Sequence, residues 1–334
     1  MQKHSITPEI QADIDKYLAK AESGDSEAQF ELGRIYCEKL KDNHKAIKFF
    51  RSSAKQGSID AKNCLACCYM TGRGVKTNYK KSINIINGVI CQNNARTFLL
   101  LGDTYRDGLG VEKDLKKAFE LYKQAVDQGN RKAFYRLGHC YEYGEGVSVN
   151  IRKAAILYKK GAEQGDMFAQ WQLGGCYKFG KGVKKNEKKA FYWIKKTAEQ
   201  GFRLAQFELA SCYHAGRGVS VNYKKTIEWM TKAAEQGFVK AQMLLGDSYE
   251  SGYLVEKDLK QAHKWHKLAA ENGNADAQYL LSRDYHSGFG VKMNKKKWKE
   301  WLDKAANNGS AKAKKLLESL EILRNNSFNI TDNK

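Results

Sequence analysis

The stretch Ala169-Gln170-Trp171-Gln172-Leu173-Gly174-Gly175-Cys176-Tyr177 decides the fold, because close variants of it return along the whole chain. The spacing between them is 36 residues. A shift of that size aligns tyrosines at Tyr69, Tyr105, Tyr141, Tyr177, Tyr213, Tyr249 and Tyr285. It also aligns an Asn or Asp at Asn78, Asp114, Asn150, Asn186, Asn222, Asp258 and Asn294. A fixed period of this length indicates stacked supersecondary units.

Each period predicts two helices and two breaks. In residues 133–165, Leu137 and Tyr141 share one apolar helical face, and Gly144 then ends the helix. Asn150 is suited to cap the start of a second helix, because its side chain can accept a bond from a free backbone N–H. That helix ends at Gly165. With a single proline in the chain, helices of this kind can continue almost throughout.

The joints between the two helices carry the motif Gly-x-Gly-Val, as in Gly72-Arg73-Gly74-Val75. Such loops resemble phosphate-binding loops only superficially, since they follow a helix instead of the strand that such a site requires. We interpret them as helix–helix joints and predict no cofactor. One copy, Gly252-Tyr253-Leu254-Val255, lacks the second glycine, and we expect that joint to differ.

Taken together, the pattern resembles the Sel1-like repeat family, a relative of the tetratricopeptide repeats. Ala169-Gln170-Trp171-Gln172-Leu173-Gly174 and Thr197-Ala198-Glu199-Gln200-Gly201 carry the resemblance, which extends from about Ala28 to about Leu317. It implies an all-α protein: a right-handed α/α superhelical solenoid of about eight helix-turn-helix repeats and about eighteen helices. Members of this family are typically adaptors in which the first helix of each repeat lines a concave face.

The ends of the chain predict a capped array. Residues 1–27 are expected to form an N-terminal capping helix that starts at Thr7-Pro8, and residues 28–309 form the solenoid. Residues 310–324 are predicted to be a C-terminal capping helix and residues 325–334 a disordered tail. We see no signal peptide and no apolar run of membrane-spanning length, so we expect a cytoplasmic protein. Export by a dedicated secretion system would leave no mark in the composition.

The eight cysteines favour packing over chemistry. Cysteines on the predicted buried face act as small hydrophobic residues, as at Cys68, Cys140, Cys176 and Cys212. Cysteines grouped near one another leave metal binding or pairing open, at Cys64, Cys67, Cys68 and Cys91. No second Cys-x-x-Cys pair follows at zinc-knuckle distance, so we predict no metal site. A secreted branch of the family has a disulfide in each repeat, and the alanines found here at those positions favour a reducing compartment.

Catalytic motifs are missing from the sequence. His263 and His266 lie three residues apart, but no glutamate completes the His-Glu-x-x-His arrangement of zinc hydrolases. We find no nucleophile elbow, and paired carboxylates on helix surfaces are usually solvated. The sequence therefore predicts a protein that is not an enzyme.

A second apolar line on the first helices is the first candidate site. Position 135 lies about 200° around the helix from Leu137, which separates it from the core face. The line comprises Leu99, Tyr135, Trp171, Phe207, Met243 and Tyr279, with His139 beside Tyr135. These side chains either pack between repeats or line a groove that binds a partner, since aromatic residues are frequent binding anchors. The sequence leaves both alternatives open.

Lysine pairs form the second candidate site, in a chain of net charge +21. They recur in the first turn of each second helix, while glutamates recur at the opposite end, which predicts one basic and one more acidic edge. The densest part of the basic edge comprises Lys181, Lys184, Lys185, Lys188 and Lys189, followed by Lys224 and Lys225. This edge is either simply solvated or attracts polyanions.

The function predicted from these features is a non-enzymatic adaptor that binds a partner protein or peptide in the concave groove. One alternative is a binder of polyanions, such as nucleic acid, acidic lipid or an acidic protein, through the basic edge. Another is a bacterial effector or immunity protein with one partner. Charges on the first helices are mixed, whereas a nucleic-acid channel would concentrate cations and aromatics together, so nucleic acid is not expected as the main ligand.

Overall fold

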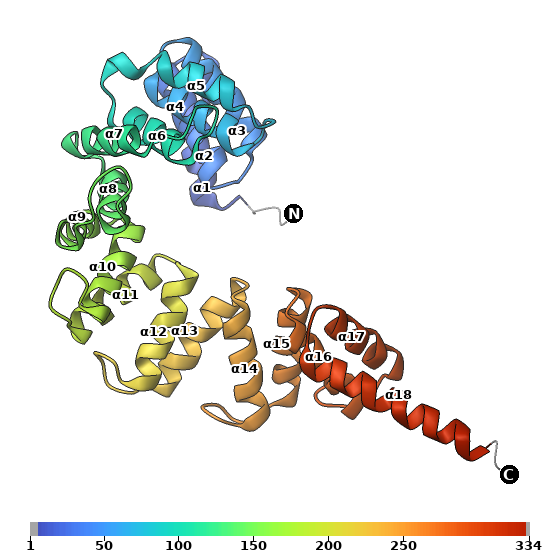
Figure 1. Cartoon of the computed structure of the whole chain (residues 1–334). Helices are drawn as coiled ribbons and strands as arrows, with labels where there is room; N and C mark the ends of the chain where they lie inside the picture. Colours follow the sequence, from blue (N-terminus) through green and yellow to red (C-terminus); the bar gives the residue numbers. More distant parts are fainter. Residues whose placement is uncertain (1–5, 332–334) are drawn as a thin grey trace. The chain divides into compact units, whose positions relative to one another are not determined.

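The computed structural model describes the backbone of residues 6–331 and the side chains of residues 6–322. Eighteen α-helices, one short 3-10 helix and no strand occur in that part of the chain (Figure 1). The helices are α1 Pro8–Glu22, α2 Ser26–Glu38, α3 Asn43–Lys55, α4 Ile59–Thr71, α5 Tyr79–Asn87, η1 Ile90–Gln92, α6 Ala95–Asp107, α7 Leu115–Asp127, α8 Arg131–Tyr143, α9 Ile151–Glu163, α10 Met167–Phe179, α11 Glu187–Glu199, α12 Arg203–Ala215, α13 Tyr223–Glu235, α14 Val239–Ser251, α15 Leu259–Glu271, α16 Ala275–Ser287, α17 Lys295–Asn307 and α18 Ala311–Thr331. The all-α repeat fold is confirmed.

The two ends of each helix are set by the residues that recur in the sequence. At the start of α9, the Asn150 side chain accepts a hydrogen bond from the Lys153 N–H at 2.9 Å. At the end of α8, Gly144 takes the left-handed conformation with φ of 75°. The first helix of a repeat then packs against the second, as α8 does against α9 and α12 against α13. Each repeat is therefore a helix pair closed by glycine and reopened by an Asn or Asp cap.

One buried position in every second helix fills the space beside the first helix, and we call it the inter-helix position. Its side chains are all buried: Phe50, Ile86, Tyr122, Tyr158, Ile194, Met230, His266 and Leu302. A glycine of the first helix allows this close approach, because a Cβ on Gly138 would stand 2.6 Å from the Tyr158 ring. Gly246 faces the His266 ring in the same way.

The joint glycines bring neighbouring repeats into backbone contact. A Cβ on Gly146 would lie 2.1 Å from the Leu115 carbonyl oxygen, so no larger residue fits there without a shift. The departing joint nevertheless keeps the left-handed backbone, because Leu254 has φ of 70°. We expected this joint to differ from the others. For the sign of φ that expectation is wrong, because Leu254 has a positive φ like the glycines at this position. A leucine in this region is strained, since its Cβ crowds the following carbonyl.

The segment of α5 and η1 differs from the second helices of the other repeats. α5 ends early, at Asn87, and the short η1 follows it. Asn93 stands where other repeats have their closing glycine and adopts a left-handed φ of 55°. Asparagine tolerates this region better than most residues, so the repeat closes without glycine.

Both ends are capped by single helices. Thr7 accepts a hydrogen bond from the Ile10 N–H at 3.4 Å and starts α1, which buries Ile14 and Ala21 against α2. α18 begins at Ala311 but continues to Thr331. Residues 325–331 are thus helical, contrary to the expected disordered tail, because no glycine or proline follows Ala311 to end the helix. The rest of that prediction, 332–334, lies outside the described residues.

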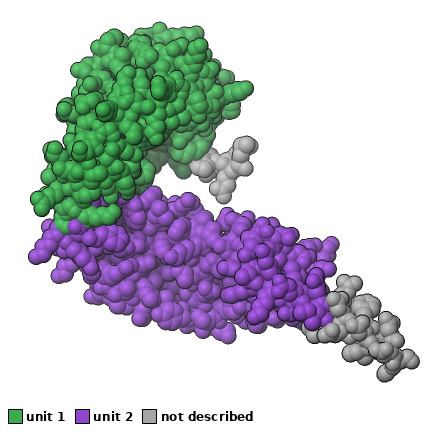
Figure 2. Space-filling model, viewed as in Figure 1, with its two compact units in different colours: residues 1–169, 181–183 green, residues 170–180, 184–334 purple. Residues whose placement is uncertain are grey.

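The chain divides into two compact units (Figure 2). Unit 1 comprises residues 1–169 and 181–183, and unit 2 comprises residues 170–180 and 184–334. The division passes through α10. In neither unit is a described helix both long and apolar enough to cross a lipid bilayer.

Candidate partner-binding surface

The apolar line predicted on the first helices is half-buried in every repeat. Leu99, Tyr135 and His139 lie in unit 1, and Trp171, Phe207, Met243 and Tyr279 lie in unit 2. Several of them pack on the neighbouring repeat. The Trp171 ring lies 5.5 Å from that of Phe202, and the Phe207 ring 5.0 Å from that of Phe238. Packing between repeats thus accounts for much of the surface of these two side chains.

In unit 1 the line widens into a surface that we call the aromatic cluster: Tyr135, His139 and Tyr143 of α8, with Phe168 of α10. The rings of His139 and Tyr143 lie 4.4 Å apart, and those of Tyr135 and Phe168 5.5 Å apart. Tyr143 is 57% exposed and Phe168 45% exposed. Burial raises the pKa of the Tyr135 hydroxyl. The cluster therefore has a packed base and an exposed rim.

Tyr143 and Phe168 were not among the residues predicted from the sequence. Tyr135, His139 and Tyr143 are four residues apart along α8, so they share one helical face. That spacing was a signal that could have identified Tyr143. Phe168 comes from the next first helix, and no sequence spacing indicates that its ring lies beside Tyr135.

Charges on the first helices are paired. In unit 1, the Arg136 guanidinium lies 2.8 Å from Asp103 and the Lys181 ammonium 3.4 Å from Glu142. In unit 2, Lys178 and Arg217 both contact Glu208, at 2.6 and 3.3 Å. His139 contacts the Glu145 carboxylate at 3.1 Å. The face is electrically mixed, as expected, and offers no continuous basic channel.

The two lysines of each pair on the basic edge have different contacts. The second lysine of a pair lies over the ring of the recurring tyrosine, as Lys189 does over Tyr177 at 5.3 Å and Lys225 over Tyr213 at 5.2 Å. Such cation–π contacts favour the fold. The first lysine of each of these pairs is exposed, as are Lys181, Lys184 and Lys185. Lys181 belongs to unit 1 and the other lysines of the predicted edge to unit 2.

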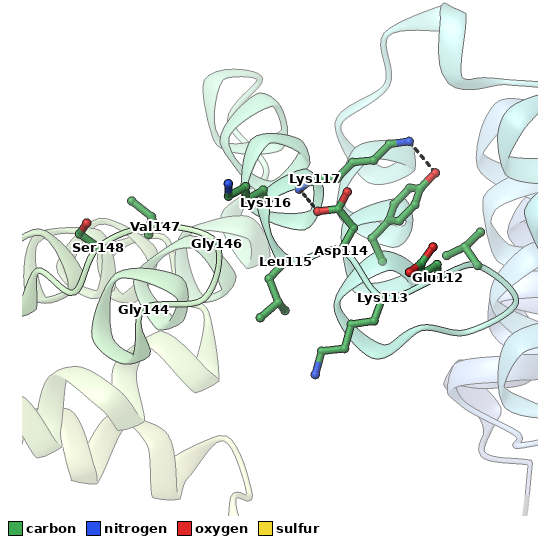
Figure 3. A pocket seen from close by; sticks show the side chains of 12 residues that line it. Glu112, Lys113, Asp114, Leu115, Lys116, Lys117, Gly144, Gly146, Val147 and Ser148 are labelled. Carbon is green, nitrogen blue, oxygen red and sulfur yellow. Dashed lines mark hydrogen bonds between the residues drawn. The ribbon is translucent and has the colours of Figure 1, made fainter.

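A hollow in unit 1 lies between two successive joints (Figure 3). It is lined by Tyr105, residues 111–117, Gly144 and residues 146–148, and in it the Lys117 ammonium donates to the Tyr105 hydroxyl at 2.7 Å. A similar hollow in unit 2 is lined by residues 255–260 with Gly290. Because it recurs with the repeat, we regard it as a feature of the joints and not as a catalytic pocket.

The described cysteines are free thiols, and burial raises the pKa of Cys68 and Cys140 to about 12. Burial therefore disfavours the thiolate form at these two positions. Among the described residues, the structure brings together one group of three potential metal ligands: Asp247, Glu250 and His266. We predicted no metal site from the sequence, and this group carries no motif. The one signal of this group in the sequence was His266, a histidine at a position where the other repeats have apolar or tyrosine side chains.

The comparison with protein families agrees with the helix pairs. The Sel1 repeat model matches eight segments: residues 26–58, 60–84, 99–130, 132–166, 168–202, 203–238, 239–274 and 275–310. The chain belongs to the Sel1 repeat family. The predicted number of about eight Sel1 repeats is thereby confirmed. A search of the curated proteins found no match.

Solved structures of Sel1 repeat proteins are similar over most of the chain. The antigen c5321 of uropathogenic Escherichia coli is 33% identical with a TM-score of 0.66, over 92% of this chain and 67% of that one. A Sel1 repeat protein from Oxalobacter formigenes is 32% identical with a TM-score of 0.64, over 92% and 90% of the two chains. The APC/C hetero-tetramer Cut9-Hcn1 shares the fold alone, at 13% identity and a TM-score of 0.51, over 96% and 60%.

Proposed function

We propose that this Sel1 repeat protein is a non-enzymatic adaptor whose aromatic cluster anchors a partner protein or peptide. Sel1 repeat proteins generally mediate protein–protein interactions. The observation that carries the proposal is the exposed rim of Tyr143 and Phe168 on a base of packed rings. Aromatic side chains held in this way bind with little loss of side-chain freedom, which is typical of binding hot spots.

The ion pairs around the cluster specify the kind of partner. Arg136 and Lys181 already contact carboxylates of their own chain. A partner therefore gains little from adding charge here, and an apolar side chain inserted between the rings gains most. The exposed first lysines of the basic edge act at longer range and accelerate association.

The test begins with capture of the partner from native lysate at moderate salt, followed by binding titrations. Tyr143→Ala combined with Phe168→Ala is expected to weaken binding by about 2 kcal/mol or more, mainly through faster dissociation. Ile156→Ala is the matched control, since Ile156 is an apolar residue of α9 with 57% exposure. Circular dichroism establishes that the variants are folded.

Charge reversal at Lys184, Lys185, Lys188 and Lys189 separates the alternatives. For the adaptor, it slows association and flattens the salt dependence but leaves dissociation unchanged. Normal binding by the folded aromatic variant, together with no binding by the lysine variant at any salt concentration, would replace the adaptor with the polyanion binder. Capture of a single toxin would instead narrow the function to that of an immunity protein.

A further inference from the structure

The inter-helix position of α15 holds a histidine where the other repeats have apolar or tyrosine side chains. His266 is fully buried, and its Nδ1 lies 3.1 Å from Oδ2 of Asp284, which is itself buried. An Nδ1–H donated to this carboxylate fixes the ring orientation and leaves the lone pair on Nε2. A carboxylate behind a histidine is the usual support of a metal-ligating imidazole.

The Nε2 atom of His266 is buried and has no hydrogen-bond partner. It faces two carboxylates from the end of α14, with Oδ1 of Asp247 at 3.9 Å and Oε2 of Glu250 at 4.0 Å. These separations are too long for hydrogen bonds. The three atoms all lie within 4.8 Å of one another. Two bonds of about 2.1 Å to a shared ion span up to about 4.2 Å, which covers both separations from Nε2. Small rotations of the exposed Asp247 and half-buried Glu250 side chains would bring all three atoms onto one ion.

We propose that Asp247, Glu250 and His266 bind one divalent transition-metal ion of the Zn²⁺ class. One imidazole and two carboxylates suit Zn²⁺ or Mn²⁺ better than Ca²⁺ or Mg²⁺, which prefer oxygen ligands alone. The position also favours a cation, because Glu250 lies in the last turn of α14, where the free carbonyl groups are negative, and Asp247 directly precedes that turn. Three protein ligands leave at least one coordination position open to solvent.

Other charged groups near the site leave an excess of negative charge. Arg283 contacts Glu250 at 2.6 Å and Asp284 at 3.3 Å, and His263 contacts Asp284 at 3.2 Å. Arg283 is the one permanent cation among these groups, against three carboxylates. The Asp247 side chain is 57% exposed, so an ion can reach the site from solvent.

In two other repeats a tyrosine occupies this position and bonds a carboxylate directly. The Tyr122 hydroxyl donates to Asp103 at 2.8 Å, and the Tyr158 hydroxyl donates to Glu142 at 2.7 Å. Asp103 and Glu142 stand at the repeat positions of Asp247 and Glu250, respectively. A tyrosine spans the distance to the carboxylate, whereas the shorter histidine does not.

The test is equilibrium dialysis of the whole protein against Zn²⁺, followed by metal analysis. The wild type is expected to bind one ion that Asp247→Asn with Glu250→Gln weakens on the order of 100-fold. Asp284→Asn, which removes the support of the imidazole, should weaken it by about 10–100-fold. Glu256→Gln and His286→Tyr, at exposed residues of the same unit, are the matched controls. His266→Tyr should abolish binding by restoring the direct contact.

Co²⁺ absorption and thermal unfolding give two further readouts. Nitrogen and oxygen ligation gives weak visible bands, whereas thiolate ligation gives intense near-ultraviolet absorption. Excess Zn²⁺ should raise the unfolding midpoint of the wild type and not that of the carboxylate double variant. The proposal is overturned if the wild type binds no Zn²⁺ below millimolar concentration, if the double variant binds as tightly, or if Co²⁺ is ligated by thiolates. The double variant changes two side chains outside the core, so the test stands even if His266→Tyr does not fold.

Discussion

The repeat of α6 and α7 and the repeat of α14 and α15 have helices of the same length and the same Asp cap on the second helix, and three of the positions at which they differ are instructive. Where the first has Tyr122, Gly110 and Lys117, the second has His266, Leu254 and Gln261. In the first repeat, each of these three residues favours the folded structure. Tyr122 bonds Asp103, Gly110 takes a positive φ without strain, and Lys117 lies 4.2 Å from the centre of the Tyr105 ring.

The second repeat gives up all three contributions and still folds in the same way. His266 makes no direct hydrogen bond to Asp247 or Glu250, and Leu254 adopts φ of 70°. Gln261 has no positive charge to place over the Tyr249 ring. Its backbone N–H still donates to the Asp258 side chain at 3.1 Å. The comparison teaches that the cap, the closing glycine and the buried alanines specify the repeat. The three positions compared here adjust stability, and the inter-helix position is free to take on another function.

The largest expected effect comes from truncating the inter-helix position. Tyr122→Ala empties a fully buried site between α6 and α7 and should cost about 3–5 kcal/mol in free energy of unfolding. Urea denaturation followed by circular dichroism measures it. Tyr143→Ala, at an exposed ring of the same unit, should change stability by less than about 0.5 kcal/mol. Equal losses from the two would mean that the core face is misassigned.

A smaller effect of opposite sign is expected at the joint. Leu254→Gly should stabilise unit 2 by about 1 kcal/mol, because glycine relieves the left-handed strain. Leu109→Gly, at the neighbouring loop position of the first repeat, is the control and should destabilise, since Leu109 packs against the core of unit 1. Thermal unfolding of both variants tests the pair. A loss of stability in Leu254→Gly would show that the packing of this leucine outweighs its strain.

The smallest effect concerns the lysine above the tyrosine ring. Lys117→Gln should cost about 0.5–1 kcal/mol, and Gln261→Lys should return a similar amount to the other repeat. Lys116→Gln removes the same charge from the exposed partner lysine and should be nearly neutral. Equal losses of unfolding free energy at Lys116 and Lys117 would mean that only the net charge matters and not the contact with the ring.

The period of the tyrosines, glycines and caps was sufficient to predict the helices, because those residues act locally. Asn150 caps α9 and Gly144 ends α8 wherever the rest of the chain lies. The positive φ of Leu254 was not predictable from leucine's own preference, because the joint keeps the left-handed backbone that Gly110 and Gly146 adopt at this position. The line from Leu99 to Tyr279 was found, but its half-burial depends on rings from the next repeat. The Asp247, Glu250 and His266 group joins two helices without a motif, so spacing could not indicate it.

The second glycine of each joint has a consequence for how such a chain can change its length. Gly146 lies on the Leu115 backbone, Gly218 on that of Glu187 and Gly290 on that of Leu259. A contact made by main-chain atoms does not depend on which side chains the neighbour carries. Whole repeats can therefore be duplicated, deleted or exchanged by recombination, and each new junction is compatible from the start. The number of repeats is in this sense free to vary without a change in how neighbouring repeats meet.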